Sequence, residues 1–587
     1  MKRIVLFIIF MVSLFFIVDL SAQEIDVLPG YGTLNDAINA NGGNKIYKLQ
    51  AGGWYGLNAI IEDSLGLTIV GTTPVPGQMP AILQTGSTSS GGTFSWMFEL
   101  YADLTIKNVF LVNADLNNAE AGHLLVGRSS SRIVLDSVTI DPTASFALLE
   151  VAPSVGVCEL YITNSLIMQH GNNTDLFDGF EFLTDQSSGW DTVYVENNTF
   201  VNTGLSFFMS NNPWQRGTPA TYRDKFLWFN HNTIMFAKQN LIGSYLYDSE
   251  FFTNNLLFMV GFVPFTNEPP GVWFNNYGDM GPKNSITCLV PMDTLMPGQE
   301  SFPSQRKSFV EYNSNYLDSR LNNIVKLGVD SGFVTYLLNI ANSPSMKDSS
   351  REAWMLSDKT DFPYFMAGNN SENMDPKFTN QKIYDVADSA VIWAKYAAEF
   401  KDWGFPSGSY PDPSTWPLIF YRADSALGYP TTWPRFDGTY SNSQLLTGSI
   451  EGLPLGDLNW FPAQKAIWQK NQASVMTHIL SEDESVINLT DVKKENNQTP
   501  TAFTLSQNYP NPFNPSTIIK YSIPKSGIVT LKVYNMLGQE VATLVNQMQK
   551  SGNYIVNFNA NKLASGVYMY RIQSGDFTLT KKMELLK

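Results

Sequence analysis

Four carboxylates and one arginine between residues 128 and 181 are the side chains best suited to chemistry. Glu150 and Glu181 fall in short strands of successive repeats, so their side chains are expected about 5 Å apart on one sheet. Two stacked carboxylates raise one pKa or bind a cation. Asp175 and Asp178 would add oxygen ligands for Ca²⁺, and Arg128 is the nearest basic side chain. The set predicts a Ca²⁺ site or an acid and base pair, whereas the simpler interpretation is a solvated polar face.

Aromatic side chains gather further along the chain, in loops rich in proline. They are Trp403, Tyr410, Trp416, Tyr421 and Trp433. Such rings pack over the flank of a core or stack on sugar rings, and packing is the simpler interpretation. Trp416 and Trp433 are the two that we single out as ligand-binding residues.

The residue patterns required for zinc binding, for phosphate binding and for polygalacturonase-type hydrolysis are not found in the sequence. The four histidines have no His-x-x-x-His spacing, and no glycine-rich phosphate loop follows a predicted strand. Asn173-Thr174-Asp175 is similar to one short motif of the polygalacturonases, but the paired-Asp, Gly-His-Gly and Arg-Ile-Lys signatures that accompany it are missing. The sequence therefore favours binding over catalysis.

A repeat must position these residues. Its pattern is an apolar residue, any residue, a second apolar residue, any residue, and then Asn or a small polar residue. It occurs at 104–108, 133–137, 160–164, 193–197, 227–231 and 252–254. The irregular spacing suits coils of three short strands whose loops tolerate insertions. Stacked amides are expected at one corner, with Asn197–Asn198, Asn232 and Asn254–Asn255 as the ladder.

A second family of strands precedes the repeat, at 123–126, 147–151, 180–183, 205–209 and 240–243. Each coil then has a first strand, a short turn, two strands flanking the Asn corner, and a long loop. Before the first coil, Thr33 is the expected N-cap of a short helix that presents Leu34, Ala37 and Ile38. Such a helix would cover the open end of the coil.

This order of helix, strand and Gly-rich turn (Leu49-Gln-Ala-Gly-Gly-Trp-Tyr55) resembles the pectate-lyase-like superfamily over residues 24–320. The resemblance implies a right-handed parallel β-helix. It also implies that lyases or hydrolases of this fold bind substrate along the first sheet.

Residues 321–480 are interpreted as a continuation or cap of the β-helix, with helical stretches at 386–400 and 463–480. Gly452-Leu-Pro-Leu-Gly-Asp-Leu-Asn-Trp460 resembles a closing motif of β-helix proteins from polysaccharide-using bacteria. Residues 481–502 are polar and predict a linker.

The last 85 residues alternate in short strands, as a β-sandwich requires. Residues 503–587 resemble the type A C-terminal sorting domain of type IX secretion cargo, an Ig-like sandwich. The resemblance rests on Tyr509-Pro-Asn-Pro-Phe513, Val533-Tyr-Asn-Met-Leu-Gly538, Leu563-Ala-Ser-Gly-Val-Tyr568 and the basic end Lys581–Lys587. It implies the type IX machinery as a partner. An ordinary Ig-like adhesion module is the alternative.

The first 23 residues predict a secretory signal peptide, since Lys2 and Arg3 precede the uncharged run from Ile4 to Val18. That run is short for a membrane span, and no transmembrane segment is expected in the mature chain. Two cysteines, Cys158 and Cys288, exclude a disulfide framework.

Charge divides the chain. Residues 503–587 hold nine Lys or Arg against three Asp or Glu, a net of +6, so the total of −15 leaves −21 for the rest. An acidic body disfavours nucleic acid and anionic membranes. It also repels polyanionic glycans unless a divalent cation intervenes.

Three functions stay open for this extracellular chain, either released or anchored at the outer-membrane surface. The first is a polysaccharide-binding β-helix protein. The second is a polysaccharide lyase or glycoside hydrolase, and the third is a structural or adhesive surface protein.

Overall fold

The computed structural model describes residues 22–115, 123–141, 149–151, 156–168, 182–184, 188–201, 208–209, 224–236, 242–243, 247–260, 307–321, 365–388, 391, 437–482, 492–494, 502–525, 527–549, 552–560, 563–575 and 577–586. The chain divides into two compact units, one dominated by the strands up to residue 368 and one that contains the C-terminal strands. Among the described residues, no helix is long and apolar enough to cross a membrane.

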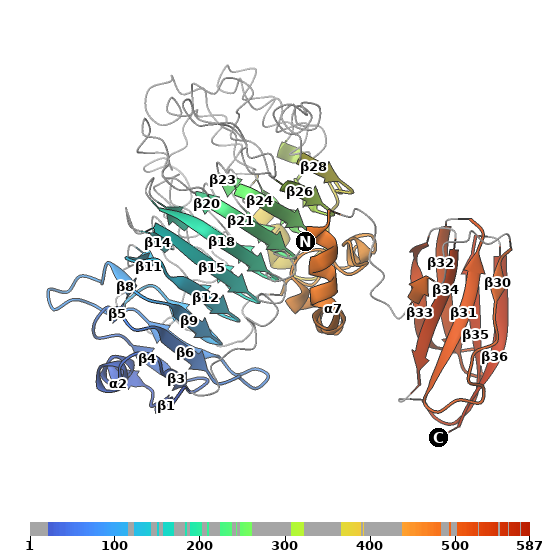
Figure 1. Cartoon of the computed structure of the whole chain (residues 1–587), viewed down its shortest axis with the longest axis horizontal. Helices are drawn as coiled ribbons and strands as arrows, with labels where there is room; N and C mark the ends of the chain where they lie inside the picture. The colour runs from blue at the N-terminus through green and yellow to red at the C-terminus, as the bar shows by residue number, and fades with distance from the viewer. Residues whose placement is uncertain are drawn as a thin grey trace, which may run out of the picture. The chain divides into compact units, whose positions relative to one another are not determined.

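Three parallel sheets form the first unit, a parallel β-helix (Figure 1). From β5 to β25 the chain visits them in the order sheet C, sheet A, sheet B, so each of these turns adds one strand to each sheet. The first two turns, β1 with β2 and β3 with β4, add strands to sheets A and B. Sheet C is therefore the predicted first sheet, and its strands coincide with the predicted second strand family.

The described strands of sheet A are β1 (Glu24–Val27), β3 (Ile46–Leu49), β6 (Leu67–Gly71), β9 (Leu104–Lys107), β12 (Arg132–Asp136), β15 (Gly156–Thr163), β18 (Ser188–Glu196), β21 (Asp224–Asn230), β24 (Tyr247–Thr253), β26 (Lys307–Glu311) and β28 (Phe365–Gly368). Those of sheet B are β2 (Gly30–Tyr31), β4 (Trp54–Gly56), β7 (Ala81–Gln84), β10 (Val109–Val112), β13 (Thr139–Asp141), β16 (Leu166–Met168), β19 (Thr199–Val201), β22 (Thr233–Met235), β25 (Leu256–Phe258) and β27 (Ser314–Tyr316). Those of sheet C are β5 (Ile61–Asp63), β8 (Trp96–Leu100), β11 (His123–Gly127), β14 (Leu149–Val151), β17 (Phe182–Thr184), β20 (Phe208–Met209) and β23 (Ile242–Gly243).

The interior of the coil is apolar because alternate residues of each strand point inward. Ile106, Leu135, Ile162, Val195 and Phe229 lie there in successive strands of sheet A, fully buried. Phe229 and Phe252 stack with ring centroids 5.0 Å apart. The repeat thus builds one continuous core along the axis.

The corner between sheets A and B holds the predicted amide ladder, in which Asn198, Asn232 and Asn255 of the predicted residues take part. Its members are Asn198, Asn232, Asn255, Asn313 and Asn370, and the amide nitrogen of each donates to the Oδ1 of the next at 2.9 to 3.2 Å. Asn197 and Asn254 instead have φ of 56° and 58° and turn the chain. Asn tolerates this left-handed conformation better than most residues.

The helix α2 (Thr33–Asn41) covers the first coil, as predicted. Leu34 is buried, and Ala37 and Ile38 pack against the core of the coil. The N-cap is Gly32, with φ of 74°, rather than Thr33, whose hydroxyl donates to the carbonyl of Gly30 at 3.2 Å.

A second apolar core lies on the outer face of sheet B. Met235 and Phe258 of the sheet pack with Phe378, Ile383 and Tyr440, which come from segments after residue 368. Residues of the predicted cap therefore cover this face of the coil in the described part of the chain.

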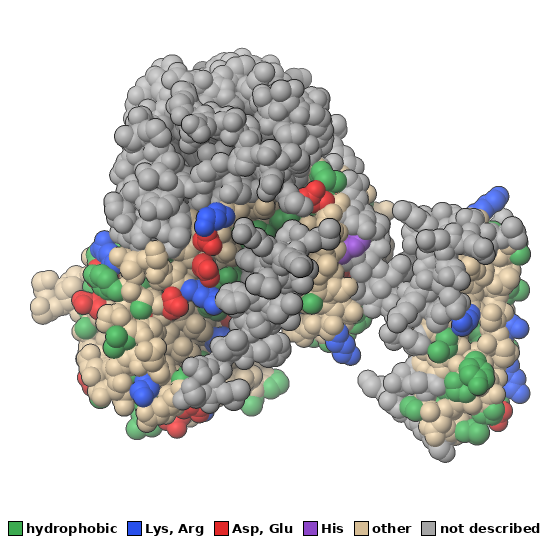
Figure 2. Space-filling view, in the orientation of Figure 1, with side chains coloured by type: hydrophobic (Ala, Val, Ile, Leu, Met, Phe, Trp, Pro, Cys, Tyr) green, Lys and Arg blue, Asp and Glu red, His purple; other side chains and the backbone are tan. Residues whose placement is uncertain are grey.

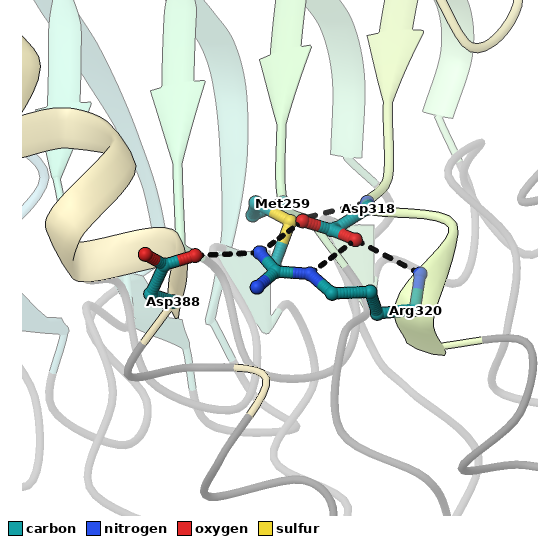
Figure 3. Close-up of polar contacts among 4 residues, drawn as sticks. All are labelled: Met259, Asp318, Arg320 and Asp388. Carbon is teal, nitrogen blue, oxygen red and sulfur yellow. Dashed lines mark hydrogen bonds and ion pairs between the residues drawn. The ribbon is translucent and has the colours of Figure 1, made fainter.

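An ion pair joins the same cover to the coil of β26 and β27 (Figure 3). Arg320, just after β27, reaches Asp318 at 2.5 Å and Asp388 of the helical residues 381–388 at 2.6 Å. Burial opposes ionisation of Asp318, yet the hydrogen bonds from Arg320 lower its pKa. The backbone amide of Asp318 donates to Sδ of Met259 at 3.4 Å.

The predicted closing motif lies across three coils at the Asn corner. The Gly456 amide donates to the Asn254 carbonyl at 2.8 Å, and Trp460 Nε1 donates to Thr199 Oγ1 at 2.7 Å. Asp457 accepts from the Thr199 hydroxyl and from the amide of Asn459, at the start of η6 (Leu458–Trp460). The motif therefore fastens β19 to the corner between β24 and β25 from outside. A further turn, η5 (Leu445–Thr447), precedes it, and α7 (Pro462–Leu480) follows it.

Two four-stranded antiparallel sheets form the C-terminal sandwich. One has the order β29 (Val492–Lys494), β34 (Gly552–Asn559), β31 (Ser516–Ile523), β30 (Thr504–Leu505). The other has the order β33 (Glu540–Gln549), β32 (Gly527–Tyr534), β35 (Gly566–Ser574), β36 (Phe577–Leu585). Because β29 pairs with β34, part of the predicted linker 481–502 is a strand of this sandwich.

Candidate functional site

The register of sheet C decides which predicted site residues can meet. Glu150 of β14 lies opposite Val126 on one side and Leu183 on the other. Leu183, rather than Glu181, is thus the neighbour of Glu150, and the expected pair of stacked glutamates does not follow from this register. Glu181 itself lies outside the described residues.

Arg128 is the predicted site residue whose side chain the structure describes. It follows β11 directly, and its Nε is 2.8 Å from Oε1 of Glu99, in the coil before. Its guanidinium carbon lies 5.2 Å from the ring centroid of Trp96. A guanidinium over an indole face is held by the charge and the ring quadrupole together. Arg128 is therefore fixed against β8.

Two further side chains complete this group, which we call the Glu99 cluster: Glu62, Trp96, Glu99, Tyr101 and Arg128. Glu62 of β5 lies opposite Glu99 in the register, so the two carboxylates start from neighbouring strands on one face. The Tyr101 hydroxyl donates to Glu99 Oε1 at 3.1 Å, and this hydrogen bond raises the pKa of Tyr101. Tyr101 remains 47% exposed.

The Glu99 cluster offers hydrogen-bonding groups beside an exposed ring. Its two carboxylates accept hydrogen bonds, and its guanidinium donates them without losing its proton. Arg128 is paired with a carboxylate, so it is poorly suited to abstract a proton. The arrangement suits a ligand with many hydroxyl groups and a flat apolar face, such as a sugar.

A row of five aromatic rings lies on the outer face of sheet A. Tyr161, Tyr194, Trp228, Phe251 and Phe309 follow one another in register, with centroids 5.9 to 6.4 Å apart. All five are buried. This row is packed, so we assign it no ligand.

Glu196 lies beside these rings and is buried. Its Oε1 accepts from Trp228 Nε1 at 2.9 Å and from Asn230 Nδ2 at 2.8 Å, and its Oε2 accepts from the Tyr194 hydroxyl. Burial raises the pKa of the Glu196 carboxyl. The three donors satisfy the carboxyl group, which is typical of a structural polar group.

The remaining predicted site residues lie outside the described residues: Asp175, Asp178, Trp416 and Trp433. The Ca²⁺ site and the sugar-stacking rings thus stay predictions. Within the described part of the chain, no three His, Cys, Asp or Glu side chains converge as metal ligands.

Sequence reasoning missed Glu62, Trp96, Glu99 and Tyr101. The predicted strand family of sheet C begins at residue 123, whereas β5 and β8 precede it. The signal was available, because Trp96-Met-Phe-Glu-Leu100 stands before the repeat at 104–108 as the later members stand before theirs.

Comparison with known proteins bears on the C-terminal unit. Residues 507–585 match the secretion system C-terminal sorting domain family. The match covers most of the sandwich and includes three of the four predicted motifs in full, namely Tyr509–Phe513, Val533–Gly538 and Leu563–Tyr568. The chain ends in a type IX secretion sorting domain. A protein with this domain is secreted or attached to the outer-membrane surface, and the domain engages the secretion machinery.

No curated protein matches the chain. Among solved structures, the PL6 family alginate lyase AlyGC is similar at 16% identity and a TM-score of 0.26, over 41% of this chain and 36% of that one. The chain thus spans about a third of the length of that lyase. This likeness carries no information on activity.

Proposed function

We propose that the β-helix binds polysaccharide outside the cell after delivery by the type IX route. The observation that supports this proposal best is the Glu99 cluster on sheet C, the sheet that the long loops border. Hydroxyl groups of a sugar would bond to Glu62 and Glu99, and Tyr101 would stack on its apolar face. Binding without cleavage is favoured because Arg128 is engaged by Glu99.

Charge selects among glycans. The part of the chain before residue 503 has a net charge of −21, the total of −15 less the +6 of the tail, and the cluster has two carboxylates for one guanidinium. The described face in Figure 2 shows acidic and basic side chains interspersed, without a broad basic patch. Neutral glycans are therefore expected to bind without metal, and uronate polymers to need Ca²⁺ as a bridge.

The test is a panel of pectic, alginate and xylan polymers, scored for binding and for new reducing ends or unsaturated products. Tyr101→Ala and Glu99→Gln should each weaken neutral-glycan binding about tenfold, equivalent to about 1.4 kcal/mol. Tyr31→Ala is the matched control, since Tyr31 is 56% exposed but lies on sheet B. Equal affinities in all three variants would refute the site.

Two further pairs of variants address the predicted residues. Glu150→Gln with Glu181→Gln should abolish only the Ca²⁺-dependent component, and Trp416→Ala with Trp433→Ala should weaken neutral-glycan binding if those rings stack on sugars. Product release that disappears in the glutamine pair would replace the binding proposal by a lyase or hydrolase. Absence of any glycan binding would favour a structural or adhesive role.

A further inference from the structure

The strand β36 leaves half of its edge open. It is the last strand of its sheet and pairs on its inner side with β35. On its outer side, the Phe513 amide donates to the Glu584 carbonyl at 2.9 Å, and the Leu586 amide donates to the Phe513 carbonyl at 2.9 Å. The opening motif Tyr509–Phe513 therefore seals the C-terminal half. For residues 577–581, no described strand pairs with the outer edge.

The open half also continues the apolar face of the core. Alternate residues of β36 share one face, and Met583 and Leu585 on that face are fully buried. Phe577 and Leu579 have the same parity, yet they are 59% and 39% exposed. Leu579 lies opposite the fully buried Ile572 of β35. The apolar core of the sandwich is therefore partly exposed to solvent at Phe577 and Leu579.

Residues 577–580 carry no protection of this edge. Natural edge strands carry charges, proline or bulges that prevent another strand from pairing. Phe577-Thr-Leu-Thr580 has none of these, and the first charge of the open half is Lys581 at its C-terminal end. The opposing sheet ends here in β30, two residues long, and Phe503 beside it reaches Phe577 with ring centroids 5.5 Å apart.

We propose that the open edge of β36 receives an extended segment of a component of the secretion machinery, as an added strand. Main-chain bonds to residues 577–581 would hold the segment, and its alternate apolar side chains would cover Phe577 and Leu579. The nine basic against three acidic residues of 503–587 favour an acidic partner, whose carboxylates would meet Lys581 and Lys582.

The experiment uses the full chain in a type IX secreting host. The double variant Phe577→Ser with Leu579→Ser should stay folded with a slightly lower melting temperature, because both side chains are partly exposed and the ring contact of Phe577 with Phe503 is lost. Loss of two apolar contacts should reduce surface delivery by about tenfold or more, with the protein retained in the periplasm. The matched control is Ile528→Ser, which is 61% exposed on the opposite face of the same sheet.

Leu579→Lys serves as a second variant if the double variant is unstable, because an inward-pointing charge on an edge opposes strand addition. A photo-crosslinking residue at Leu579 should capture a machinery component. Normal delivery of folded edge variants would overturn the proposal. Equal retention of Ile528→Ser, or a crosslink to a second copy of this chain, would overturn it too.

Discussion

Replacement of Asn232 by Ala tests the amide ladder where it is most connected. Asn232 Oδ1 accepts from both the backbone amide and the side-chain amide of Asn198, at 3.1 and 2.9 Å. Asn232 Nδ2 donates to the carbonyl of Val195 at 3.0 Å and to Oδ1 of Asn255 at 3.2 Å. All of these groups are buried, so water cannot replace the lost partners.

The loss of stability in Asn232→Ala follows from the number of buried groups that lose a hydrogen-bond partner. The Asn198 side chain keeps its bond to the Ile162 carbonyl, but its backbone amide loses its acceptor. One orphaned buried amide costs about 1 to 3 kcal/mol, and each other lost bond costs about 1 kcal/mol. We therefore expect Asn232→Ala to lower the free energy of unfolding by about 3 to 5 kcal/mol.

The control is Asn197→Gly at the neighbouring corner position. Asn197 has φ of 56°, a conformation that glycine adopts readily, and its Oδ1 has no hydrogen-bond partner in the described part of the chain. Its replacement should change the free energy of unfolding by less than about 1 kcal/mol.

Urea unfolding measures both variants, and hydrogen exchange of the Asn198 amide locates the effect, because a long coil need not unfold in one step. The Asn198 amide should exchange faster in Asn232→Ala only. If Asn232→Ala proved no more costly than Asn197→Gly, the ladder would not be a source of stability.

Three other predictions concern single contacts. Thermal unfolding should show that Gly456→Ala lowers the free energy of unfolding by about 1 to 3 kcal/mol more than Gly77→Ala does. The two glycines have similar φ, but a Cβ added at Gly456 would lie 2.3 Å from Thr233 Oγ1, whereas a Cβ added at Gly77 would meet open space. Burial raises the pKa of the Glu196 carboxyl in the folded protein. The wild type should therefore lose stability as pH rises from the unfolded-state pKa of about 4.3 through the folded-state pKa. Urea unfolding across that pH range should show no such loss for Glu196→Gln. Deletion of residues 492–587 should leave a folded body in the periplasm, seen by fractionation and protease protection; normal surface display would contradict this.

The repeat determined the coil because strand alternation is a local property of the sequence. An apolar residue at every second position must face a core, so the strands of sheets A and C could be read from the chain alone. The sandwich of residues 503–587 followed from the same alternation and from motifs that resemble the sorting domain.

Only the tertiary structure decided which residues of different coils meet. Two adjacent asparagines, Asn197 and Asn198, fit the corner pattern equally well, and the turn geometry assigned the ladder to the second. The loops of a coil vary in length, so sequence spacing could not place Arg128 beside Glu99 or Leu183 beside Glu150. A register is a long-range choice, because it depends on the packing of neighbouring strands rather than on either strand by itself.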